Sequence, residues 1–160
     1  MTSFLRLAGK VAVAHAATYL IAGSIAYQLL TKQFYTGPDP LFGSYMRTET
    51  QPAVWSHVTT WFLPENLLRG VLMAAALYPF LGTLVSWPFL KRFLSISALY
   101  LVFGYWAAAG AVPGNLEGLV YLRPEFTPRV HLIVQPEIIG QGLLLGLWLA
   151  WWIAPRTARK

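Results

Sequence analysis

Four long runs of apolar residues dominate the chain. They cover about residues 11–30, 64–85, 93–112 and 136–154. A helix of twenty residues is roughly 30 Å long, which matches the hydrocarbon core of a bilayer. The pattern therefore predicts an all-α, polytopic membrane protein with four transmembrane helices. Proline positions support these limits, since Pro64 suits the first position of a helix and Pro155 the position after one.

Composition excludes the main alternatives to a membrane protein. Apolar residues make up 56% of the 160 positions and charged residues only 11%, against about 25% charged in an average globular protein. Such a chain is too apolar for a soluble surface and for intrinsic disorder. Because it has no cysteine, disulfides, thiolate catalysis and Cys-ligated metals are also excluded.

Basic residues orient the predicted bundle. Seven lie in the termini and the short turn between the second and third helices: Arg6, Lys10, Lys91, Arg92, Arg156, Arg159 and Lys160. The two long loops carry four, matched by four acids. The positive-inside rule then places both termini in the cytoplasm and both long loops outside, in a plasma membrane or a bacterial inner membrane. Anionic lipid headgroups account for the +6 net charge better than nucleic acid does.

The two halves of the chain resemble each other in three places. Residues 17–23 match 98–104, residues 45–52 match 121–128, and residues 64–70 match 136–142. The second match carries the pattern Tyr-x-Arg-x-Glu-x-x-Pro in both copies. This indicates a single membrane domain made of two tandem helical-hairpin repeats, about 10–85 and 92–154, related by a pseudo-two-fold axis along the membrane normal. It also argues that the first helix is retained and is not a cleaved signal peptide.

Small residues four positions apart predict how the helices pack. Gly70 and Ala74 on the second helix match Gly142 and Gly146 on the fourth. Such pairs let helix backbones approach closely in lipid. We expect these two helices to face the central axis.

Candidate ligand-binding residues cluster toward the outer openings. Glu65 and Glu137 fall in the first turns of their predicted helices, where a carboxylate also caps free amides. Arg69 follows Glu65 by one turn and could pair with it, and Gln141 takes the equivalent position after Glu137. The loops add Tyr45, Arg47, Tyr121, Arg123, His57 and His131. Simple stapling of the loops by hydrogen bonds is the alternative role for the loop residues.

Other chemistries find little support in the sequence. His57 and His131 with the two glutamates lack the spacings of known helical metal sites, so we predict no metal and no cofactor. His15 has no second histidine at its depth to bind haem, and hydrogen bonding to a neighbouring helix is its expected role.

Three functions remain open. The leading interpretation is an outward-facing polar pocket between the two repeats, binding a lipid headgroup, a quinone-like molecule or a small anion. The second is an accessory subunit of a larger membrane complex, or a homo-oligomer. The third is a membrane enzyme that uses Glu65 or Glu137 as an acid or base on a lipid-soluble substrate.

Overall fold

The computed structural model describes residues 2–38 and 40–154, and within these ranges the chain is helical and contains no strand. In order, the elements are α1 (Thr2–Ala26), η1 (Tyr27–Thr31), α2 (Lys32–Thr36), η2 (Leu41–Ser44), α3 (Pro52–Leu77), η3 (Tyr78–Phe80), α4 (Leu81–Ser86), α5 (Phe89–Ala98), η4 (Leu99–Trp106), α6 (Leu116–Tyr121), α7 (Pro128–Ile133) and α8 (Gln135–Trp152). Both η1 and η4 are π-helical and continue the helices before them.

Three helices are long and apolar enough to cross a membrane: Ser3–Thr36, Pro52–Ser86 and Pro128–Trp152. The fourth predicted span corresponds to α5 with η4, which ends at Trp106 rather than near residue 112. The second helix begins at Pro52, so Pro64 lies inside α3 and not at its start. The sequence could not locate this start because residues 52–63 mix aromatic and hydroxyl side chains.

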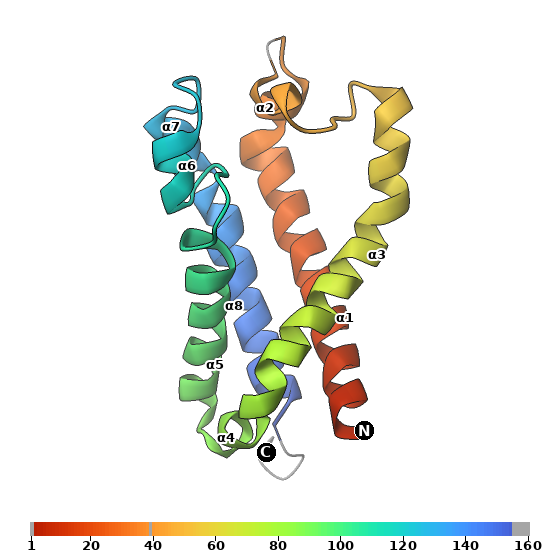
Figure 1. The fold of residues 1–160 in the computed structure, drawn as a ribbon, viewed down its shortest axis with the longest axis vertical. Helices are drawn as coiled ribbons and strands as arrows, with labels where there is room; N and C mark the ends of the chain where they lie inside the picture. The colour runs from red at the N-terminus through yellow and green to blue at the C-terminus, as the bar shows by residue number, and fades with distance from the viewer. Residues whose placement is uncertain (1, 39, 155–160) are drawn as a thin grey trace.

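Both described ends of the chain lie at the same end of the bundle, which we call the terminal end (Figure 1). The elements α2, α6 and α7 lie at the opposite, loop end (Figure 1). Since α8 has eighteen residues, it is about 27 Å long. The helix from α1 through α2 is longer and extends past it at the loop end.

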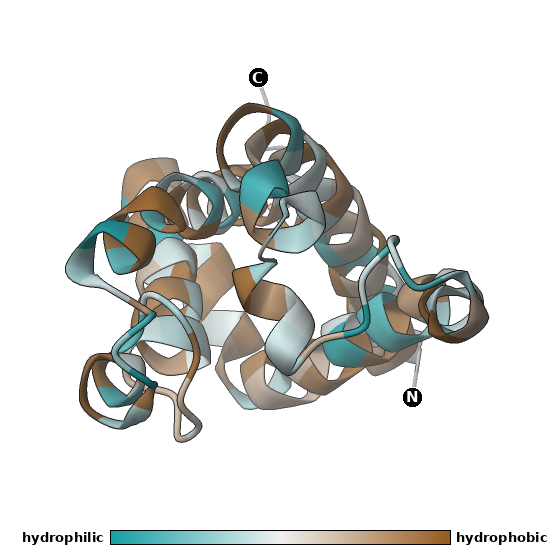
Figure 2. Ribbon diagram, turned by 90° about the horizontal axis from the view of Figure 1, so that it is seen from above, coloured by the Kyte–Doolittle hydropathy of each residue, from teal (hydrophilic) through white to brown (hydrophobic). Residues whose placement is uncertain are grey.

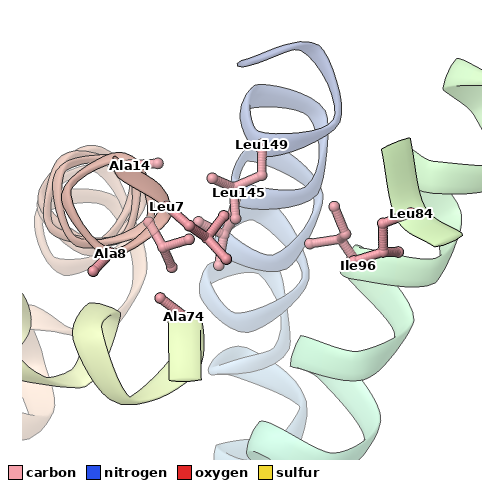
Figure 3. Packing of buried hydrophobic residues seen from close by; sticks show 9 residues of the cluster. Leu7, Ala8, Ala14, Ala74, Leu84, Ile96, Leu145 and Leu149 are labelled. Carbon is pink, nitrogen blue, oxygen red and sulfur yellow. The ribbon is translucent and has the colours of Figure 1, made fainter. Parts of the chain in front are cut away.

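The helices pack as two hairpins, α1 with α3 and α5 with α8, and the hairpins meet where α1 contacts α8. Gly70 lies against the backbone of Ala12 on α1, and Gly146 lies against Ser97 on α5. The small residues therefore pack within each hairpin. Of the two helices expected to face the central axis, α8 lies at the contact between the hairpins, whereas α3 packs mainly on α1. A core cluster at the terminal half contains Leu7, Ala14, Ala74, Ile96, Leu145 and Leu149 (Figure 3).

Large apolar side chains also cover the outside of the bundle. Leu29, Leu72 and Phe103 are 75%, 62% and 71% exposed. Seen from above, hydrophobic positions reach the outer faces of the helices (Figure 2). This surface is suited to lipid and is much more apolar than the isolated patches of soluble monomers.

Two cations fasten the terminal end. The guanidinium of Arg92, which is only 3% exposed, donates to the Ala150 carbonyl at 2.7 Å and to the Val85 and Trp87 carbonyls at 3.3 Å. The Lys10 amine donates to the Trp152 carbonyl at 2.7 Å. These bonds satisfy carbonyls at helix C-termini, where a positive charge is favourable. Two of the basic residues in the termini and the short turn thus have a structural role, which the number of basic residues on each side of the membrane did not reveal.

Candidate functional site

A cleft of about 1020 Å³ lies at the loop end, between the helix formed by α1, η1 and α2 and the first half of α3. We call it the loop-end cleft. Residues 44–47, Glu49 and Gln51 border it, and one residue of the second hairpin, Glu137, contributes to its lining. Six aromatic side chains line it: Tyr19, Tyr27, Tyr35, Tyr45, Trp55 and Phe62.

The cleft follows from where the first hairpin crosses. The two helices touch most closely at Gly70 and Ala12. On the loop side of this contact α3 runs obliquely to α1, so the first half of α3 stands apart from α1 (Figure 1). The rings of Tyr19 and Phe62 meet at 5.6 Å between centroids. Beyond this contact the helices separate, which leaves room for a ligand.

An aromatic network holds the border of the cleft. Tyr35 packs edge-on to Phe42 at 4.9 Å, and Tyr45 packs edge-on to Phe126 at 5.6 Å. Phe126 belongs to the second long loop, so both loops contribute to this cluster. Burial raises the pKa of Tyr45 to about 12. Its phenol, which is uncharged at neutral pH even at the ordinary pKa of about 10, is a hydrogen-bonding group at this border.

The two charged loop residues of the cleft differ in role. Glu49 accepts a 2.6 Å hydrogen bond from the Tyr27 hydroxyl, so it fastens the loop to η1, which is the structural role considered for the loop residues. Arg47 is exposed and lines the cleft. It forms no ion pair with any residue in the described ranges.

Glu137 is the acidic group deepest in the helical part of the cleft. It belongs to the first turn of α8, as predicted, and one carboxylate oxygen lies 3.4 Å from where a side chain at Gly23 would begin. Within the described part of the chain nothing donates a hydrogen bond to it or pairs with its charge. A partly buried carboxylate without a partner is costly in an apolar setting and is a reasonable candidate for function.

Glu65 and Arg69 form the predicted ion pair, at 3.3 Å, but outside the cleft lining. Their side chains are 50% and 51% exposed. Glu65 is the fourteenth residue of α3 because the helix begins at Pro52. It therefore cannot cap the first turn, and Glu137, although it lies in a first turn, accepts no hydrogen bond from a described backbone amide.

A layer of buried polar atoms crosses the middle of the bundle. One side chain comes from each of four helices: His15 on α1, Asn66 on α3, Ser97 on α5 and Gln141 on α8. Each has at least one buried nitrogen or oxygen without a hydrogen-bond partner among the described residues. The contacts of Gly70 with Ala12, Gly23 with Glu137 and Gly146 with Ser97 place all four within about two helical turns in depth.

This layer lies directly beneath the cleft. The ring of His15 is 6.1 Å from that of Tyr19, which lines the cleft, and 6.2 Å from that of Tyr100. Arg69 is near enough to interact electrostatically with all three. Sequence reasoning named His15, Arg69 and Gln141 but missed Asn66 and Ser97, whose common depth depends on the helix crossings.

The remaining predicted site residues are not brought together. Tyr121 is 74% exposed, and neither it nor Arg123 lines the cleft. His57 is exposed on α3 beside Trp61, whereas His131 is buried in the second loop, where its Nδ1 accepts a 2.9 Å hydrogen bond from the Gly114 amide. In the described ranges, no three His, Asp or Glu residues are grouped as metal ligands.

The fold and the cleft define an all-helical protein in which three to four helices can span a membrane. The chain matches no known protein family, and no curated protein or solved structure is significantly similar to it. Its function must therefore be argued from the cleft itself.

Proposed function

We propose that this protein is an integral membrane protein that binds an amphiphilic, lipid-soluble ligand in the loop-end cleft. The apolar side chains Leu20, Val54 and Val58 and the aromatic walls would hold the hydrocarbon part of the ligand. Tyrosine hydroxyls, Gln28 and Glu137 would hold its polar head. Pockets with mostly apolar walls and a few polar groups are the usual form of a small-molecule site.

The charges of the cleft favour a lipid-like ligand over a small anion. Two carboxylates, Glu49 and Glu137, and one guanidinium, that of Arg47, line it. Because Glu49 is engaged by Tyr27, Glu137 is the acceptor available to the ligand. We infer a head group that donates hydrogen bonds, such as one with hydroxyl or amino groups.

The unpaired carboxylate of Glu137 is the observation that carries this proposal, and Glu65 offers a matched control. Glu137→Gln keeps the side chain's shape and removes its charge. We expect it to weaken ligand binding roughly tenfold or more, the cost of losing a charged hydrogen bond. Glu65→Gln, outside the cleft, should change binding less than about twofold.

The measurement is native mass spectrometry of the full chain from mild detergent, followed by identification of co-purifying lipids. Loss of one amphiphile from the Glu137 variant alone would support the proposal. Equal retention by both variants, or a wild type that carries no lipid-soluble molecule, would reject it.

A subunit role is the second candidate, and it is favoured by the Glu65–Arg69 ion pair. Arg69 is the eighteenth residue of α3 and half exposed, and an ion pair facing hydrocarbon is costly. A partner helix that covers this face would remove the cost. A photo-crosslinker at Leu72 should then form a defined adduct in intact membranes, while one at Leu147 on α8 should not. No adduct at either site would exclude this role.

We also propose that both termini are cytoplasmic, so that the cleft opens to the outside. The seven basic residues of the termini and short turn support this orientation. Cysteines introduced at Thr36 or Thr127 should react with a membrane-impermeant reagent in intact cells, and one at Ser86 should not. The opposite labelling would place the cleft on the cytoplasmic side.

The duplication remains a proposal that rests on the sequence matches and on one packing feature. Gly70 and its proposed equivalent Gly142 both contact the preceding long helix of their own hairpin. The loop triplets differ, however, since Tyr45 lies in the cleft and Tyr121 outside it. The two copies would therefore have diverged most at their loop ends. Superposing one hairpin on the other is the direct check, and it requires a rotation near the two-fold value.

A further inference from the structure

A second cavity, of about 1090 Å³, lies at the terminal end of the bundle. It is lined by the first turns of α1, by η3 and α4, and by the end of α8, with Ser3, Arg6, Lys10, Tyr78, Gly82 and Trp152 among its walls. We call it the basic pocket. It is distant from the loop-end cleft, and its lining shares no residue with that cleft.

The charged side chains that line the basic pocket in the described part of the chain are all positive. Arg6 and Lys10 are one helical turn apart on α1 and both line it, and no described residue of the lining is acidic. Arg6 is exposed and forms no ion pair within the described ranges. Lys10 lines the pocket and donates to the Trp152 carbonyl. Two cations on adjacent turns therefore present a local positive potential.

Hydroxyl groups add hydrogen-bonding capacity beside these charges. The Ser3 hydroxyl and the Tyr78 phenol lie 2.8 Å apart and form one hydrogen bond with each other. Each hydroxyl can make further bonds. At Gly82 a side chain would meet nothing within 4 Å, so the wall formed by α4 leaves open space.

We propose that the basic pocket is a phosphate-binding site that takes the head group of an anionic phospholipid. Arg6 and Lys10 would neutralise the phosphate, the two hydroxyls would hydrogen-bond to its oxygens, and the apolar residues Leu7, Leu81 and Val85 would contact the start of the acyl chains. Basic pockets between membrane helices are known to bind lipid phosphates in this way. A soluble phosphate would meet the same cations, so the test must separate the two sources.

The test uses the full chain in neutral detergent. Wild-type protein is titrated with phosphatidylglycerol, with phosphatidylcholine, and with inorganic phosphate, and bound lipid is counted by native mass spectrometry. Arg6→Gln should weaken phosphatidylglycerol binding about fivefold. Lys91→Gln removes a cation of the same end that lies outside the pocket, and it should change binding less than about twofold.

A second pair of variants tests the cavity without changing charge. Gly82→Leu should fill the basic pocket and weaken binding at least as much as Arg6→Gln does. Gly9→Leu is its control, since Gly9 is equally open but outside the lining.

Binding of phosphatidylglycerol over phosphatidylcholine, lost in Arg6→Gln and Gly82→Leu alone, supports the proposal. An equal loss of phosphatidylglycerol binding in each variant and its control would mean that the basic residues of this end attract the lipid without a defined site, and would overturn the proposal. Inorganic phosphate that competes fully at millimolar concentration would keep the phosphate site but reject the lipid as its occupant.

Discussion

The first hairpin opens toward its loop, whereas the second is closed by its own loop. In the second, α6 and α7 cover the loop end, and Phe126, Val130 and Val134 form a core there with Leu101, Ile138 and Phe42, the last from the first loop. In the first, α1 and α3 separate and leave the loop-end cleft. Both hairpins are held together by small-residue contacts, but the loop end is open in the first and covered in the second.

Hydrogen bonds of the loops explain the difference. The second loop is fastened by the half-buried Gln135, which donates to the Gly114 carbonyl at 2.8 Å and accepts from the Trp106 indole at 3.0 Å, and by the buried side chains of His131 and Asn115. Among the described residues of the first loop, one side-chain bond reaches its helices, from Tyr27 to Glu49. The polar side chains of the second loop are thus used within that loop, whereas those of the first loop border the loop-end cleft.

The crossing glycines should give the largest effect. A side chain at Gly70 would collide with the backbone of α1, whereas one at Gly142 would meet the side chains of Leu101 and Tyr100, which can shift. We expect Gly70→Ala to lower the free energy of unfolding by about 3 kcal/mol and Gly142→Ala by about 1 kcal/mol. Unfolding in mixed micelles measures both. Equal losses of stability would mean that both helix contacts tolerate an added methyl group equally well.

The loop of the second hairpin should be the next most sensitive. Asn115 caps α6, since its Oδ1 accepts from the Val112 and Gly118 amides, and its Nδ2 donates to the Gly110 carbonyl at 2.8 Å. Asn115→Ala should cost about 2 kcal/mol and speed amide exchange over residues 107–122. Tyr27→Phe, which removes the bond from η1 to Glu49 of the first loop, should cost under about 1 kcal/mol. The reverse order would show that the first loop is the more strongly fastened.

Hydrophobic runs predicted the helical class and the position of α8 within about two residues. They failed at Pro52, because the first turns of α3 carry hydroxyl and aromatic residues that do not resemble a membrane span. The ion pair of Glu65 with Arg69 followed from helical spacing, which is local. The cleft, the carbonyl contacts of Arg92 and the polar layer depend on where helices cross, and that information is not local.

The polar layer should respond weakly to removal of its members. His15 is 1% exposed, and both its ring nitrogens lack partners in the described chain. Replacing such a group by an apolar one of similar size removes a desolvation cost. We expect His15→Leu to be neutral or stabilising by up to about 1 kcal/mol, and Gln141→Leu on the second hairpin to behave alike. A loss above about 2 kcal/mol at either site would reveal a bound water or ligand that satisfies it.

The smallest effect on stability should come from Glu65. If Arg69 were buried, Glu65→Gln would leave its charge without a partner at a cost of several kcal/mol. The structure shows both side chains half exposed, and an exposed pair one turn apart contributes only about 0.5 kcal/mol. We therefore expect Glu65→Gln to shift thermal unfolding in detergent as little as Glu137→Gln does, with ligand retention separating the two. A loss near 3 kcal/mol for Glu65→Gln in native membranes, absent in detergent, would instead indicate that a partner seals this face of α3 and that Arg69 becomes buried only in the assembly.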